Sequence, residues 1–125
     1  MGILSALLGH ASEADVDDVE QTLEKILADD EKVERAFRLV RDLLIFTNRR
    51  FLLVDRQGVT GKKSSYHSIP YRAITGFVVE TAGHFDMESE LKIWVSSNPE
   101  PIQRTFTRGS TIFEVQKALA TYVGR

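Results

Sequence analysis

The chain has 125 residues, of which 42% are hydrophobic and 27% are charged, and its formal net charge is −2. This length and composition are typical of one globular domain with a buried core. The absence of cysteine excludes disulfide bonds, thiolate metal sites and a cysteine nucleophile. No apolar run approaches the roughly 20 residues of a membrane-spanning helix. The first residues lack the basic region of a secretory signal, so we expect a cytoplasmic protein.

The charge is divided unevenly along the chain. Residues 1–31 carry nine acidic side chains and one basic side chain, whereas residues 32–125 carry nine acidic and fifteen basic. We call these two parts the acidic arm (1–31) and the basic body (32–125). We expect the two parts to neutralise each other, within one subunit or between subunits. Contact of the basic body with an anionic partner is the alternative.

Two helices are predicted in the acidic arm. Apolar residues within 3–8 fall on one face at helical spacing. Ser12 or Asp15 can cap a second helix. Its apolar stripe consists of Val16, Val19, Leu23, Ile26 and Leu27. The next segment, 32–40, fits a helix and a strand almost equally well by periodicity alone.

Short antiparallel strands are predicted through most of the basic body. The apolar segments 43–46 and 51–54 flank a polar turn at Asn48, a residue type that tolerates left-handed backbone angles. Further turns are expected at Gly58 and near Pro99. A final amphipathic helix is predicted from Ser110 to Val123. This order predicts a mainly β (α+β) domain, with about seven strands in a barrel or sandwich and a helix that covers one end.

Several motifs resemble those of the bacterial pleckstrin-homology-like (bacterial PH) domain family. They include Arg41-Asp42, Phe46-Thr47-Asn48, Gly61-Lys62-Lys63, Ile69-Pro70-Tyr71 and Phe85-Asp86. The resemblance covers essentially the whole chain. It implies a PH-like seven-stranded antiparallel barrel capped by a C-terminal helix, with residues 32–40 as its first strand. It also implies a ring-shaped homo-oligomer, because similar proteins form rings, and a pentamer is the candidate form.

The resemblance does not carry phosphoinositide binding onto this chain. PH domains that bind phosphoinositides use a basic loop between their first two strands. The corresponding connection here is Arg41-Asp42, which is too short and too balanced in charge to hold a headgroup.

The segments 43–46 and 51–54 are apolar on both faces, although an antiparallel sheet normally buries only one face. Either the N-terminal helices or a neighbouring subunit must cover the second face. We predict a neighbouring subunit in a cyclic homo-oligomer. The candidate interface residues are Leu44, Phe46, Leu52, Val54 and Trp94. Trp94 is included because it alternates with Leu91, Ile93 and Val95, which places it on the outside as a possible anchor.

A candidate basic surface consists of Arg49, Arg50, Arg56, Lys62 and Lys63. It indicates an alternative function, peripheral binding to a membrane surface that carries anionic lipid. The aromatic residues near these basic residues lie at core-like positions. Nucleic-acid modules instead expose aromatic side chains for stacking, so we expect no nucleic-acid partner.

No pattern of residues predicts an enzyme. Segment 58–64 contains glycines and lysines, but their spacing differs from a phosphate loop and the segment joins strands. His84 and the carboxylates that follow it lack the spacing of a known metal loop. His67 and its neighbouring serines do not match a catalytic triad. We therefore expect no catalytic residue, cofactor or metal, and we predict a self-assembling interaction or scaffold module, with another protein as a second candidate partner.

Overall fold

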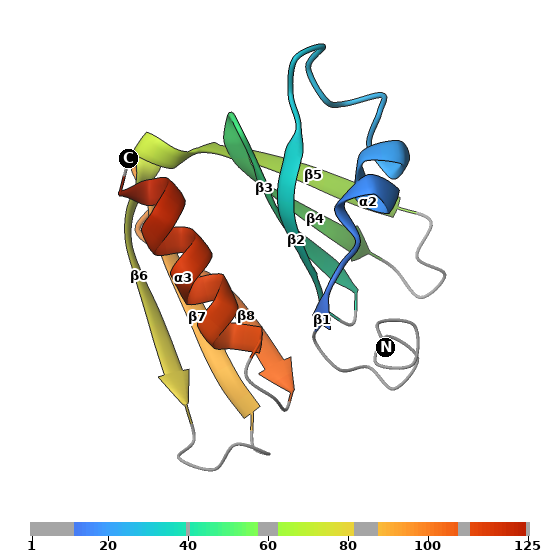
Figure 1. Cartoon of the computed structure of the whole chain (residues 1–125). Coiled ribbons are helices and arrows are strands. Elements are labelled where there is room, and N and C mark those ends of the chain that lie inside the picture. Colours follow the sequence, from blue (N-terminus) through green and yellow to red (C-terminus); the bar gives the residue numbers. More distant parts are fainter. Residues whose placement is uncertain (1–11, 40, 58–62, 82–87, 108–110, 125) are drawn as a thin grey trace.

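The structure is a computed structural model of the chain, and it describes residues 12–39, 41–57, 63–81, 88–107 and 111–124 (Figure 1). The first sheet contains β1 (Ser12–Glu13), β2 (Val33–Arg38), β3 (Asp42–Thr47), β4 (Arg50–Gln57) and β5 (Lys63–Pro70). The second sheet contains β6 (Ile74–Thr81), β7 (Glu88–Val95) and β8 (Ile102–Thr107). The helices are α2 (Val16–Thr22) and α3 (Thr111–Val123), and a 3-10 turn, η1 (Tyr71–Ala73), joins the two sheets.

Both sheets are antiparallel, and strands that are adjacent in sequence pair with each other. The seven strands β2 to β8 confirm the prediction for the basic body, and β2 resolves the ambiguity of residues 32–40 in favour of a strand. The prediction of a closed barrel was wrong, because β5 and β6 belong to separate sheets. Pro70 ends β5 without an N–H to donate, and η1 then turns the chain out of the first sheet.

The main core lies between the two sheets and α3. Side chains from β3 and β4 that face the second sheet are almost fully buried there, including Leu44, Phe46, Phe51 and Leu53. The inner side of α3 joins this core through Ile112, Val115, Leu119 and Tyr122. The Tyr122 ring stacks between Phe46 and Tyr71, at centroid distances of 5.4 and 5.3 Å. The predicted C-terminal helix is therefore confirmed, although its expected cap, Ser110, lies outside the described residues.

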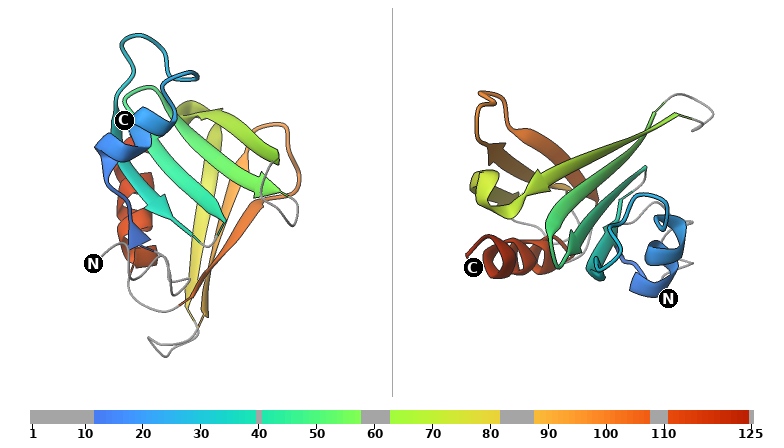
Figure 2. Two further views of the ribbon diagram at one scale, coloured as in Figure 1. Left: turned by 90° about the vertical axis from the view of Figure 1, so that its right-hand side faces the viewer. Right: turned by 90° about the horizontal axis from the view of Figure 1, so that it is seen from above.

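The acidic arm covers the opposite face of the first sheet. Figure 2 shows α2 on one side of this sheet and the second sheet with α3 on the other. Val19 and Leu23 are buried against Ile45, Leu52 and other outward-facing residues of β2 to β4. A strand pair that is apolar on both faces is thus covered within one subunit, by a helix on one side and the main core on the other.

Only part of the predicted helical arm is helical in the described residues. Asp15 caps α2, and its carboxylate accepts hydrogen bonds from the amides of Asp17 at 2.9 Å and Asp18 at 3.2 Å. Ser12, the other candidate cap, lies in β1 instead. The helix ends at Thr22, and turns carry the chain on, so that Ile26 and Leu27 still pack against the sheet. The helix predicted within 3–8 lies outside the described residues.

Of the three predicted turns, two are confirmed. Asn48 and Arg49 form the connection between β3 and β4, and residues 96–101 connect β7 to β8. In the second connection Ser97 has a φ of 69°, so the reversal is sharp. Gly58 lies outside the described residues.

Leu23 tests whether the acidic arm is an integral part of the fold. Replacing it with alanine is expected to lower the free energy of unfolding by about 2 kcal/mol, because Leu23 is only 3% exposed and its loss leaves a cavity over β3 and β4. Urea denaturation followed by circular dichroism measures this change. Glu24→Ala, at the exposed neighbouring position, should change stability little. Equal stability of Leu23→Ala and the parent would show that the arm does not cover the sheet.

Candidate functional site

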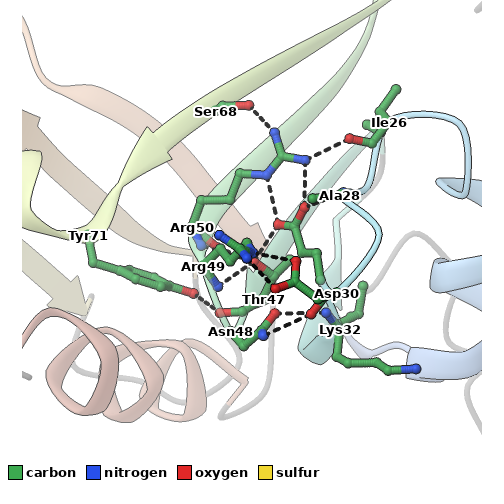
Figure 3. Close-up of polar contacts among 12 residues, drawn as sticks. Ile26, Ala28, Asp30, Lys32, Thr47, Asn48, Arg49, Arg50, Ser68 and Tyr71 are labelled. Atoms are coloured by element: carbon green, nitrogen blue, oxygen red, sulfur yellow. Dashed lines mark hydrogen bonds and ion pairs between the residues drawn. The ribbon is translucent and has the colours of Figure 1, made fainter.

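The turn between β3 and β4 holds a network of polar side chains that ties the acidic arm to the first sheet (Figure 3). Arg50 donates from Nε and Nη2 to the two carboxylate oxygens of Glu31, at 2.8 and 2.9 Å. It also donates to the carbonyl of Ile26 at 2.8 Å and to the hydroxyl of Ser68 at 2.6 Å. Arg50 therefore joins residues 26–31, β4 and β5 at one point.

Glu31 is almost completely buried in this network, with a side chain only 1% exposed. Its carboxylate also accepts from the Thr47 hydroxyl at 2.6 Å and the Ala28 amide at 2.9 Å. Burial alone raises the pKa of Glu31, but hydrogen bonds from Arg50, Thr47 and the Ala28 amide outweigh it and lower the pKa to about 2. The Thr47 hydroxyl and the Glu31 carboxylate are both closed to solvent, so this pair is structural.

The remaining turn residues fasten the end of the arm from the outside. Asn48 accepts a hydrogen bond from the Lys32 amide at 2.7 Å and donates to the carbonyl of Asp30 at 3.2 Å. Arg49 forms an exposed ion pair with Asp30, and the hydrogen bond from Arg49 lowers the pKa of that carboxyl group. Arg35 forms an ion pair with Glu13, with 3.0 Å between Nη2 of Arg35 and Oε2 of Glu13. Three acidic residues of the arm, Glu13, Asp30 and Glu31, therefore pair with arginines of the basic body within the subunit.

A depression of about 510 Å³ lies beside this network, between residues 26–28 of the arm and strand β5. Its lining consists of Ile26, Leu27, Ala28, Glu31, Arg49, Arg50, Ser68, Pro70 and Arg72. Three arginines and a serine hydroxyl therefore meet an apolar wall at one place on the surface.

The five residues of the candidate basic surface do not form one patch in the described structure. Arg49 and Arg50 are paired with Asp30 and Glu31. Lys63 is exposed at the start of β5, at the opposite end of the β4–β5 pair from the turn. The side chain of Arg56 and all of Lys62 lie outside the description.

Of the five candidate interface residues, the structure buries four within the subunit. Leu44 and Phe46 face the main core, and Leu52 and Val54 lie under the acidic arm; none is more than 5% exposed. The arm, rather than a neighbouring subunit, covers the second apolar face in this structure, so these four side chains are not exposed to a partner. Trp94 is half-buried on β7, as expected for a side chain that alternates with buried Leu91 and Ile93.

Strand β5 is an edge strand of the first sheet. It pairs with β4, and in the described part of the chain it lies at the end of the strand order. Lys63 and Pro70 lie at its ends, and no acidic or basic residue except His67 lies between them. Tyr66 is 51% exposed near the middle of the strand. This edge could not be recognised from the sequence, because it depends on where the two sheets separate.

A second polar cluster joins the two sheets. Asp42 and Asp55 are direct cross-strand partners on β3 and β4. Arg104 on β8 forms an ion pair with each of them, at 2.8 Å from Nε to Asp42 Oδ2 and 2.8 Å from Nη2 to Asp55 Oδ1. Burial, and then the neighbouring carboxylate of Asp55, raise the pKa of Asp42 to about 6, although the charge of Arg104 opposes this shift. The cluster was not predicted, because it depends on the strand register and on the placement of β8.

Within the described ranges, no three histidine and acidic side chains gather closely enough to hold a metal ion. His84 and Asp86 lie outside those ranges. His67 is exposed on β5. No helix in the described part combines the length and apolar character needed to cross a membrane.

Two antiparallel sheets followed by a C-terminal helix define a PH-like fold. The model of the bacterial PH domain family matches residues 2–123, and the chain belongs to this family. It is 50% identical to "Uncharacterized protein YjqA" of Bacillus subtilis over 96% of this chain and 97% of that protein. A pleckstrin homology domain from Shewanella amazonensis has 51% identity and a TM-score of 0.82, covering 98% of each chain. A protein with a pleckstrin-homology domain from Shewanella loihica has 47% identity and a TM-score of 0.80, covering 92% of this chain and 98% of that one.

Proposed function

We propose that the chain is a non-enzymatic PH-like domain that assembles with copies of itself through the free edge of β5. The observation that carries this proposal is the eight-residue strand Lys63–Pro70, which pairs on one side only in the described structure. The outer edge of such a strand presents unpaired backbone N–H and C=O groups, to which another strand can add.

The two edge strands of the second sheet, β6 and β8, carry constraints that β5 lacks. Helix α3 packs against β6. Arg104 holds β8 close to the first sheet through its ion pairs with Asp42 and Asp55. Strand β5 has neither constraint, and exposed Tyr66 adds an aromatic side chain of the kind that contributes strongly at interface centres.

A ring follows if β5 of one subunit adds to a different edge of the next. Such a contact is heterologous, and it closes into a ring when the rotation between subunits permits. Ring formation would agree with what the family resemblance implies, and half-buried Trp94 on β7 remains a candidate contact. Pairing of β5 with β5 would instead give a dimer with two-fold symmetry.

The alternative function, binding to an anionic membrane surface, is less well supported. Two of its five basic residues, Arg49 and Arg50, are already paired with carboxylates. Their charge is therefore largely cancelled before any lipid approaches.

Tyr66→Asp tests the proposed assembly. It should shift the protein toward smaller species at micromolar concentration, because it places a charge at the centre of the proposed contact without disturbing the core. Multi-angle light scattering after size exclusion measures the mass.

Phe113→Asp is the matched control, because Phe113 is 46% exposed on the outer side of α3, away from β5. It should leave the mass unchanged. A monomeric parent protein, or an equal loss of mass in both variants, would contradict assembly through β5.

A further inference from the structure

The depression beside Arg50 offers a ligand hydrogen-bond donors but no free carboxylate oxygen. The only carboxylate in its lining is Glu31, and both of its oxygens are already occupied. Oε1 accepts from the Ala28 amide and from Arg50, and Oε2 accepts from Thr47 and from Arg50. The donors that remain lie on the arginines and on Ser68. A group that only accepts hydrogen bonds is the complement of such a surface.

Two of these donors are held in place before a ligand arrives. The guanidinium of Arg50 is fixed by Glu31 and by the carbonyl of Ile26, and its Nη1 donates to Ser68 at 2.6 Å. The Ser68 oxygen accepts this hydrogen bond, so its own hydroxyl hydrogen is free to donate. Groups that are already ordered lose less conformational freedom on binding.

The charges in and around the depression set the charge of the ligand. Arg49, Arg50 and Arg72 stand against two carboxylates, Asp30 on Arg49 and Glu31 on Arg50. Within the described ranges, Arg72 makes no hydrogen bond or ion pair. One positive charge is therefore left uncompensated, which suits a monoanion better than a dianion such as a phosphate monoester.

The apolar side of the depression indicates that the rest of the ligand is apolar. Ile26, Leu27 and Pro70 line the depression beside the donors. We propose that this depression binds a carboxylate attached to an apolar group, with the carboxylate near Arg72, Arg50 and Ser68 and the apolar group against Ile26, Leu27 and Pro70. A branched-chain fatty acid and the C-terminus of a peptide that ends in leucine both supply this chemistry.

Titration of the full-length, ¹⁵N-labelled protein with 4-methylpentanoate tests the site. We expect saturable shifts of the Ala28 and Ser68 amide resonances and of the Arg50 Nε–H resonance, with a dissociation constant in the millimolar range or below. The neutral 4-methylpentanamide should cause no comparable shift. Inorganic phosphate should bind more weakly than the acid.

A leucine-terminated peptide with a free or an amidated C-terminus distinguishes the two sources of the carboxylate. Tighter binding of either the acid or the free peptide supports the proposal.

Arg72→Gln tests the assignment at residue level, because Arg72 is exposed and takes no part in the folded network. We expect binding to weaken about tenfold, as for loss of one charge-assisted hydrogen bond. Lys63→Gln removes an exposed charge at the other end of β5 and should leave binding unchanged. The proposal is overturned if the acid causes no saturable shift, if the amide binds as well as the acid, if phosphate binds more tightly, or if Arg72→Gln binds like the parent.

Discussion

Replacing Arg50 with alanine is expected to lower the free energy of unfolding by about 3 to 5 kcal/mol. The substitution leaves the Glu31 carboxylate buried at 1% exposure, without the guanidinium that neutralises it. Thr47 and the Ala28 amide still donate to the carboxylate, but neither carries a charge. The variant also loses the link from β4 to Ile26 and Ser68. Urea denaturation at neutral pH, followed by circular dichroism, measures the change.

Arg49→Ala is the matched control for Arg50→Ala. The two arginines are adjacent in sequence and pair with adjacent acids, but the Arg49–Asp30 pair is exposed, at 51% and 70%. Solvent and salt screen such a pair, so its loss should have a much smaller effect. Equal losses in the two variants would contradict the view that Arg50 is the buried anchor of the arm.

The stability of the protein should fall as the pH rises from about 4 to about 6, through the Asp42 carboxyl group. Its pKa is raised to about 6 in the folded state from 3.8 when unfolded, so in this window the folded protein binds more protons than the unfolded chain. The stabilisation is complete below the lower value and is lost above the higher one. By linkage it amounts to at most about 3 kcal/mol.

Asp42→Asn isolates this effect, because asparagine is neutral at every pH while Arg104 keeps its two contacts with Asp55. The variant should show a flatter profile between pH 4 and 6 and should be more stable than the parent at pH 8. Glu80→Gln, which removes an exposed partner of Lys92, should keep the parent profile. A parent whose stability changes between pH 4 and 6 in the same way as that of Asp42→Asn would contradict the raised pKa of Asp42.

The strands and turns could be predicted from the sequence because their signals are local. Alternation, the apolar segments around Asn48 and the amphipathic pattern of α3 each depend on residues that are near one another in the chain. Closure of the barrel is not local. It depends on hydrogen bonding between strands of the two sheets, including β5 and β6 on either side of Pro70 and η1. The family resemblance implied a barrel, but the strands form two separate sheets.

The candidate site was predictable only in part, for a similar reason. The uneven charge indicated attraction between arm and body, and three such ion pairs are present, but the sequence could not show which of them is buried. Glu31–Arg50 and Arg49–Asp30 look alike in sequence and differ in exposure. The two apolar faces of β3 and β4 correctly required a cover, but the choice between helix and neighbouring subunit depended on the packing of Val19 and Leu23.

Hydrogen exchange of the β5 amides at two protein concentrations tests assembly through this edge most directly. In an isolated subunit, the outward-facing amides of β5 have no strand partner and should exchange rapidly, whereas those bonded to β4 are protected. Assembly predicts that protection of the outward-facing amides grows with protein concentration in the parent and not in Tyr66→Asp. If the β5 amides exchange at the same rate at low and high concentration while amides elsewhere become protected, the contact between subunits lies on another surface.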